Sequence, residues 1–194
     1  MPRKPDAKLE ARIVDAAYKL WSKRGEKALT MRAVARAAGT TTPTMYQRFD
    51  DKSDLLELLR DRALRNLVSV LQPALSPADT CRRFLAFAAI HPHEYRLLTE
   101  DWGARLGRAN EKRPTFDLIK KRLATQLGGT PEDHSRLALA LGALLHGTAT
   151  MLMAEGVQAH TVRQLRSICN EACETLIHSA AHNGAQTRRS GRKR

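Results

Sequence analysis

Residues 12–56 constrain the fold of this chain more than any other stretch, because helix start and stop signals follow one another there at short spacing. An amphipathic pattern over 8–24 ends at a glycine. Thr30 and Thr41 each stand where a hydroxyl caps the first free amides of a helix, and Gly39 lies between them. The order predicts one longer helix followed by two short helices that a tight turn joins.

The second short helix, over 42–48, carries a signal of its own. Pro43 falls in its first turn, where backbone amides have no partner within the helix. Because proline lacks an N–H, the Thr41 hydroxyl is left to cap the amide of Thr44. Two short helices joined at this spacing are typical of a helix-turn-helix, whose second helix enters the major groove of duplex DNA.

Composition favours an all-α fold for the whole chain of 194 residues. Ala and Leu recur at helical spacing, whereas the chain has only two Trp and four Phe. We expect further helices over 53–72, 77–91, 93–105, 113–127, 131–156 and 161–182. The predicted organisation is a disordered basic arm (1–7), a three-helix helix-turn-helix DNA-binding domain (8–52), a helical ligand-binding and dimerisation domain (53–183) and a disordered basic tail (184–194).

Positive charge gathers at the two ends of the chain. The net charge is +13, and residues 1–50 hold 11 Lys and Arg against 5 Asp and Glu. Residues 184–194 hold 5 basic residues and no acid, whereas 51–183 hold 17 against 15. Basic ends of this kind favour contact with the phosphates of a nucleic acid. A near-neutral middle favours packing on itself or binding of an uncharged ligand. Double-stranded DNA is therefore the expected partner.

Several other classes of protein are disfavoured. The apolar stretch 137–145 is far shorter than the roughly 20 residues that span a bilayer, and the N-terminus has no signal core, so no membrane partner and a cytoplasmic location are expected. Three cysteines without a disulfide spacing indicate a reducing compartment. The chain has no glycine-rich phosphate loop and no Ser-His-acid arrangement, so neither an enzyme nor a cofactor is expected.

The N-terminal residues resemble the DNA-binding domain of the tetracycline-repressor (TetR) family. The matching run is Arg12-Ile13-Val14, Ala16-Ala17, Gly25, Thr30, Val34-Ala35, Ala38-Gly39, Thr41, Thr44-Met45-Tyr46, Phe49, Lys52 and Leu55-Leu56. The resemblance implies a one-component transcriptional regulator, most often a repressor. Such a protein binds a near-palindromic operator as a homodimer and is released by a small effector.

The resemblance also implies DNA contacts. Phosphate contacts carry over to Thr30, Thr41, Tyr46 and Lys52, and Arg32 lies on the outer face of the first short helix. Thr42, Pro43, Thr44, Gln47 and Arg48 are the candidates for reading bases. The family often has glycine at Pro43 and histidine at Arg48, so the operator sequence does not follow by analogy. Alternatively, the two threonines are only caps and Tyr46 only packs.

The middle of the chain holds candidates for an apolar effector pocket. The aromatic run before His91-Pro92 and the pair His146-Gly147 resemble fragments of the family's C-terminal domains, although Gly142 occupies the place of an expected tryptophan. The pocket candidates are Phe84, Phe87, Tyr95, Trp102, Phe116, Leu145, His146 and Met151. The alternative is that each of these side chains simply packs in the core. His146 would then be a core histidine whose hydrogen bonds are satisfied there.

Two apolar stripes in the last helices predict a dimer interface of four helices. They consist of Leu137, Leu141, Leu144, Thr148 and Leu152 on the first helix, and Leu165, Ile168, Cys169, Ala172 and Leu176 on the second. Burial within one subunit accounts for part of the same pattern.

Two other functions remain open at this point. Cys169 with Cys173, and His178 with His182, have the i,i+4 spacing of helix-borne metal ligands, so a metal-responsive regulator is one alternative, although no metal is expected. A constitutive protein that coats DNA without reading its sequence is the other, because the basic tail favours sequence-independent binding.

Overall fold

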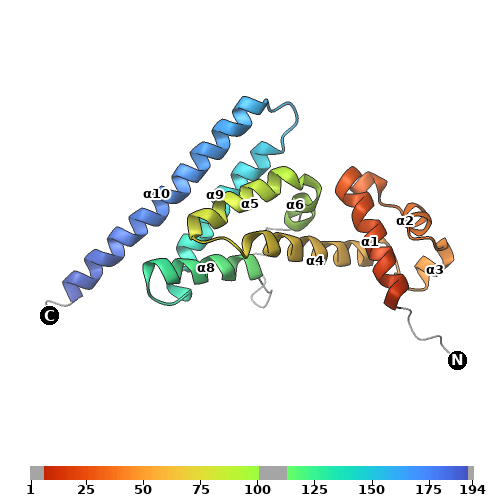
Figure 1. The fold of residues 1–194 in the computed structure, drawn as a ribbon, viewed down its shortest axis with the longest axis horizontal. Coiled ribbons are helices and arrows are strands. Elements are labelled where there is room, and N and C mark those ends of the chain that lie inside the picture. Colours follow the sequence, from red (N-terminus) through yellow and green to blue (C-terminus); the bar gives the residue numbers. More distant parts are fainter. Residues whose placement is uncertain (1–6, 101–112, 192–194) are drawn as a thin grey trace. The chain divides into compact units, whose positions relative to one another are not determined.

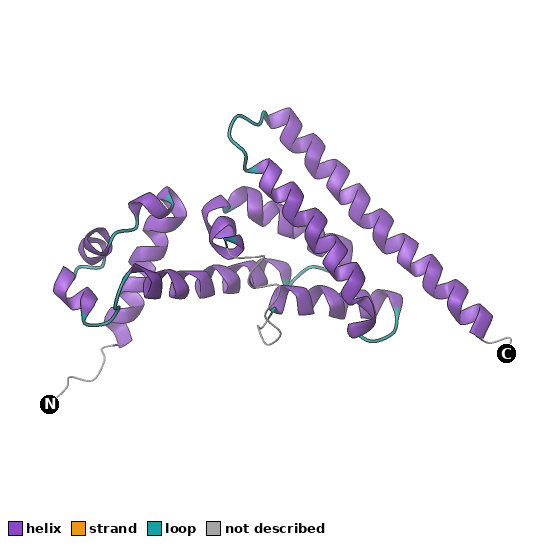
Figure 2. Ribbon diagram, turned by 180° about the vertical axis from the view of Figure 1, so that it is seen from behind, coloured by secondary structure: helices purple, strands orange, loops and turns teal. Residues whose placement is uncertain are grey.

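A computed structural model of the chain describes residues 7–100 and 113–191. These residues form helices joined by turns and loops, and no strand occurs among them (Figure 2). The all-α prediction is confirmed. Residues 1–6, Trp102 and the last residues of the predicted helix 93–105 lie outside the described ranges.

The described residues divide into two compact units, and the boundary falls within α4, after Asn66. Unit 1 contains α1 to α3, the first part of α4, and α6 (Figure 1). The bounds are α1 Ala7–Arg24, the 3-10 helix η1 Glu26–Ala28, α2 Met31–Ala37, α3 Thr42–Tyr46, α4 Lys52–Leu71 and α6 Pro92–Thr99.

The core of unit 1 follows the apolar faces of these helices. Ile13 and Trp21 of α1 are buried together with Val34 of α2, Met45 of α3 and Leu59 of α4. These positions recur at helical spacing in the sequence, which is why each short helix has one face to bury. The packing holds α2 and α3 against α1, and it leaves their polar faces exposed.

Helix α6 also belongs to unit 1, which the sequence did not lead us to expect. The Trp21 indole Nε1 donates to the His93 carbonyl (3.2 Å), and the Arg60 Nε donates to the Leu97 carbonyl (3.3 Å). Gly25, with φ 67°, leaves room for the His93 ring, because a Cβ there would lie 2.9 Å from its Nδ1. The predicted division between residues 52 and 53 therefore differs from the compact units.

Unit 2 contains the end of α4 and the helices of the C-terminal half. Their bounds are α5 Pro77–Ile90, α8 Pro114–Leu127, the 3-10 helix η2 Glu132–His134, α9 Ser135–Leu152 and α10 Ala159–Gly191. Helices α9 and α10 lie side by side and run in opposite directions (Figures 1 and 2), and both pack against α5.

Helix α10 is longer than predicted. It continues to Gly191, so most of the tail over 184–194 that was expected to be disordered is helical. Extending an existing helix costs little per residue once its first turn has formed, which sequence composition alone does not reveal.

A charged network fixes the start of α5. An Asp79 carboxylate oxygen accepts hydrogen bonds from the Arg83 Nε (3.0 Å) and from the backbone amide of Leu75 (3.2 Å). The Arg83 bond above all, and then the Leu75 amide, hold the pKa of Asp79 below its ordinary value, against the opposing effect of burial. Both bonds are stronger when the carboxylate is ionised.

We expect this network to make part of the stability depend on pH. Because the folded pKa of Asp79 is depressed, its contribution is present above the unfolded pKa, about 3.9, and is lost as the pH falls through the folded value. Urea unfolding of the wild type and of Asp79→Asn at pH 7 and at successively lower pH checks this. The difference in unfolding free energy between the wild type and Asp79→Asn should become smaller as the pH is lowered. The exposed Asp61→Asn serves as the control, and a difference that stayed constant with pH would contradict the prediction.

Candidate DNA-binding surface

Two threonine caps set the beginnings of α2 and α3, as predicted. The Thr30 hydroxyl accepts the Ala33 amide (3.1 Å), and the Thr41 hydroxyl accepts the Thr44 amide (3.4 Å). The two hydroxyls of Thr41 and Thr44 also share a hydrogen bond of 2.8 Å. Thr30 and Thr41 are exposed at helix N-termini, where free amides and hydroxyls together suit a phosphate oxygen.

Helix α3 presents its predicted base-reading residues to the surface. Pro43 and Gln47 are exposed, Thr42 and Thr44 are partly exposed, and the Tyr46 side chain is 56% exposed. Met45, which is fully buried, anchors the opposite side of the helix in the core. Burial of that single face orients the other side chains outward. Because Tyr46 is so exposed, its phenol is free to meet a ligand, and packing alone does not explain its position.

The first turn of α4 adds charge beside α3. Asp51 caps this helix through bonds from the amides of Ser53 and Asp54 (2.6 and 3.3 Å). The Lys52 ammonium pairs with the Glu26 carboxylate at 2.9 Å, and both side chains remain partly exposed. Arg32 is exposed and Arg48 half-exposed. The ten predicted DNA-contact residues therefore all lie on α2, on α3 or next to them.

One residue of this surface was missed as a functional residue. The Arg12 guanidinium donates to the Ala38 carbonyl (2.6 Å) and, more weakly, to the Gly39 carbonyl (3.4 Å). Gly39 has φ 65°, a left-handed conformation that favours glycine. Arg12 thus ties α1 to the turn between α2 and α3. Its place in the matching run was the only signal in the sequence.

The described effector candidates are divided between the two compact units. Phe87 and Leu145 are buried in unit 2, where Phe84, Phe116 and His146 are partly exposed. Tyr95 is buried in unit 1, and the Met151 side chain is 56% exposed on α9. The assignment of these residues to an effector pocket stays a prediction.

The predicted dimer stripe of α9 also needs correction. Leu141 and Thr148 are 1% and 8% exposed, and Cys169 of α10 is 2% exposed, so these three residues pack inside their own subunit. Leu137, Leu144, Leu152, Leu165 and Ala172 are partly exposed, whereas Ile168 and Leu176 are exposed. The exposed apolar residues of α9 are Leu139, Ala140, Ala143, Gly147 and Met151. These five residues, with Ile168 and Leu176, are called the α9–α10 face below.

The cysteines belong to the core of unit 2. Cys81, Cys169 and Cys173 are all buried, and a hydrogen bond with Cys81 and then burial raise the pKa of Cys173. His178 and His182 are exposed, so the structure does not bring these imidazoles together with the thiols. Among the described residues, no group of three His, Cys, Asp or Glu side chains is placed to hold a metal ion. Nor does any described helix have the length and apolar character needed to cross a membrane.

Comparison with known protein families agrees with this architecture. Residues 13–59 match the model of the bacterial regulatory proteins of the TetR family. Residues 77–176, more than half of the chain, match a tetracycline-repressor-like C-terminal domain. The chain therefore belongs to the TetR family, and it is a DNA-binding transcriptional regulator with a helix-turn-helix domain.

Individual relatives show the same likeness. The HTH-type transcriptional repressor DrrR1 of Streptomyces coeruleorubidus is 37% identical over 76 residues, which are 39% of this chain and only 25% of that protein. A TetR-like regulator from Rhodococcus sp. RHA1 is 25% identical, with a TM-score of 0.56 over 95% of this chain and 99% of that one. A TetR from Streptomyces coelicolor shares the fold alone, at 20% identity and a TM-score of 0.62, over 88% of this chain and 96% of that one.

Proposed function

We propose that this protein is a one-component repressor that reads a near-palindromic operator through α3. The observation that carries the proposal is the exposed side of α3, where Pro43, Tyr46 and Gln47 project from a helix fixed by a threonine cap and a buried methionine. The Gln47 amide suits bidentate pairing with adenine, and the apolar groups of Pro43 suit thymine methyls. Thr30, Thr41, Tyr46 and Lys52 supply phosphate contacts that set the register.

The α9–α10 face is the proposed dimer interface. Leu139, Met151 and Ile168 are 51%, 56% and 55% exposed, which is unusual for side chains of this size. Ala143 and Gly147 lie between the two large residues of α9, and an added Cβ at Gly147 would meet nothing within 4 Å in this chain. Small residues allow a second helix to approach closely. A dimer also supplies the second recognition helix that an operator of two half-sites requires.

Release by an uncharged effector completes the proposed mechanism. The chain between residues 51 and 183 is nearly neutral, which suits an apolar ligand. An effector lowers operator affinity only to the extent that it binds one conformation better than the other. Titrating candidate apolar ligands into the protein–operator complex tests this part separately. A ligand that binds the protein and leaves operator affinity unchanged would contradict it.

Sequence preference is the first test. We expect anisotropy of labelled DNA from upstream of the protein's own gene to show binding at least about a thousandfold tighter than to a scrambled duplex. A protein that merely coats DNA would bind both duplexes alike, and both complexes would weaken together as salt rises. If the upstream DNA is not preferred, selection of bound fragments from the whole genome shows whether any sequence is.

Two substitutions separate reading from anchoring. Gln47→Ala should remove discrimination at one base pair, by about 1–3 kcal/mol, and leave affinity for random duplexes nearly unchanged. Lys52→Ala should weaken all duplexes alike and reduce the salt dependence of binding by about one phosphate contact for each subunit. Anisotropy against a set of operator variants measures both effects, with the exposed Lys121→Ala in unit 2 as control. Equal losses on operator and random DNA for Gln47→Ala would show that Gln47 does not read a base.

A further inference from the structure

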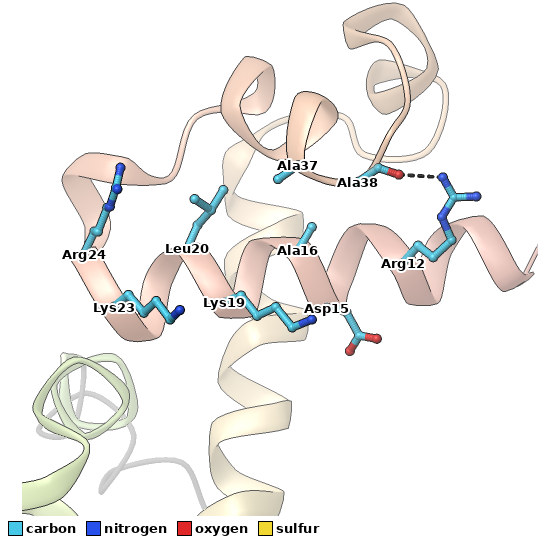
Figure 3. Close-up of a pocket in the computed structure, with 9 residues that line it drawn as sticks. All are labelled: Arg12, Asp15, Ala16, Lys19, Leu20, Lys23, Arg24, Ala37 and Ala38. Atoms are coloured by element: carbon cyan, nitrogen blue, oxygen red, sulfur yellow. Dashed lines mark hydrogen bonds between the residues drawn. The ribbon is translucent and has the colours of Figure 1, made fainter.

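A hollow of about 460 Å³ lies between α1 and the end of α2, beside the surface described above and sharing Arg12 with it (Figure 3). Ala16 and Leu20 of α1 face α2 across its floor. Arg12 and Arg24 stand at its two ends, and Lys19 and Lys23 lie along its edge. In the following, these four basic residues are called the α1 basic rim.

The charge of this rim is largely uncompensated. Within the described part of the chain, no ion pair involves Lys19, Lys23 or Arg24. The one acidic lining residue, Asp15, is paired with Arg62 of α4. The hydrogen bond and charge of Arg62, and to a smaller extent the charge of Lys19, hold the pKa of Asp15 below its ordinary value, so this carboxylate stays ionised and offsets only part of the charge of the rim. An anion approaching the rim meets a net positive surface.

The rim is long and linear. From Arg12 to Lys23 an α-helix rises by roughly 16 Å, several times the size of a single phosphate ion. Duplex DNA carries a phosphate about every 3.4 Å along each strand, so a backbone presents a row of charges over that length. The spacing of the rim therefore suits a polymeric anion better than a compact one.

The position of the rim points to the same duplex that α3 reads. Arg12 belongs to the rim and also donates to the carbonyls of the helix-turn-helix turn at Ala38 and Gly39. The rim is therefore built on the same compact unit as the recognition helix. We propose that the α1 basic rim binds the phosphate backbone of the DNA that flanks each half-site, extending the footprint beyond the bases that α3 reads. This inference rests on the proposed function.

Duplex length isolates the contribution of the rim. Anisotropy is measured with a short duplex that holds only the bound site and with a long one that adds about one helical turn, roughly 10 base pairs, on each side. The variants are Lys19→Gln, Lys23→Gln and the two together, with Lys121→Gln as the charge-matched control on α8. On the long duplex, the double variant should bind roughly tenfold more weakly than the wild type at low salt. The slope of log K against log salt should fall by about 3.6, because the double variant removes two lysines from each of two subunits.

The two duplexes distinguish a phosphate contact in the flanking DNA from a general effect of the substitutions. A loss on the long duplex with unchanged binding to the short one supports the proposal. Unchanged binding to both, or equal loss on both with an unaltered unfolding curve, overturns it. The proposal is also overturned if millimolar inorganic phosphate displaces the long duplex from the wild type but not from the variant without Lys19 and Lys23. The rim would then be a site for a compact anion. Failure of the proposed function differs from failure of this inference, because the wild type would then show no preference for any DNA sequence.

Discussion

We expect Leu139→Glu to convert the proposed dimer to monomers and to abolish tight operator binding. Leu139 is 51% exposed on the α9–α10 face, and a two-fold interface repeats each substitution on both subunits. Burying two carboxylates without partners costs far more than the apolar contact they replace. A monomer retains only one recognition helix, so its affinity should fall by a factor of at least about a thousand, to that of non-specific binding.

Leu75→Glu is the matched control for this prediction. Leu75 is 95% exposed in the loop between α4 and α5, outside the α9–α10 face, and takes the same change of charge and size. Sedimentation velocity gives the oligomeric state of each variant, and DNA anisotropy gives its affinity. If Leu139→Glu stayed dimeric, or if Leu75→Glu dissociated equally, the assignment of this face would be wrong.

The sequence was sufficient for the DNA-binding helices because their signals are local. The bond from the Ala33 amide to Thr30, and that from the Thr44 amide to Thr41, join residues three apart in the chain. A cap of this kind acts within one turn of the helix and does not need the rest of the fold. The same holds for Gly39, whose conformation the turn itself requires.

The inward face of α9 was not predictable in the same way. This helix is apolar on nearly every side, so spacing alone does not distinguish the face that packs on its own subunit from the face that stays exposed. Leu139 and Leu141 are two positions apart and look alike in the sequence. The first is exposed and the second is buried, because α5, α8 and α10 already cover one side of the helix.

The place of α6 depends on contacts between distant parts of the chain. The bond from the Trp21 indole to the His93 carbonyl joins residues 72 positions apart. A charged residue such as Glu94 is almost always exposed unless it is paired, and its sequence context gives no partner. In the structure it is buried, which only the packing of α1, α4 and α6 explains.

Glu94 is the centre of a buried polar network that holds these three helices together. Its carboxylate accepts the Asn66 amide (2.9 Å) and lies 3.1 Å from the His91 Nδ1. The Asn66 amide also donates to the Tyr18 hydroxyl (3.2 Å). Burial and the hydrogen bond to Glu94 raise the pKa of Tyr18, as expected for a phenol that donates to a carboxylate. Removing the carboxylate therefore takes the acceptor from the partly buried Tyr18 hydroxyl and one acceptor from the partly buried Asn66 amide, which keeps its bond to Tyr18.

We expect Glu94→Ala to lower the free energy of unfolding by roughly 1–3 kcal/mol, the cost of one buried polar group that loses its partner. Glu94→Gln keeps one acceptor oxygen and the side-chain volume, so it should cost less than half as much. Urea unfolding measures all variants, with Glu57→Ala as the exposed control on α4. Operator affinity should fall with Glu94→Ala, because the network helps to position α1, against which α2 packs. If Glu94→Ala and Glu57→Ala unfolded alike, the buried carboxylate would contribute nothing that an exposed one does not.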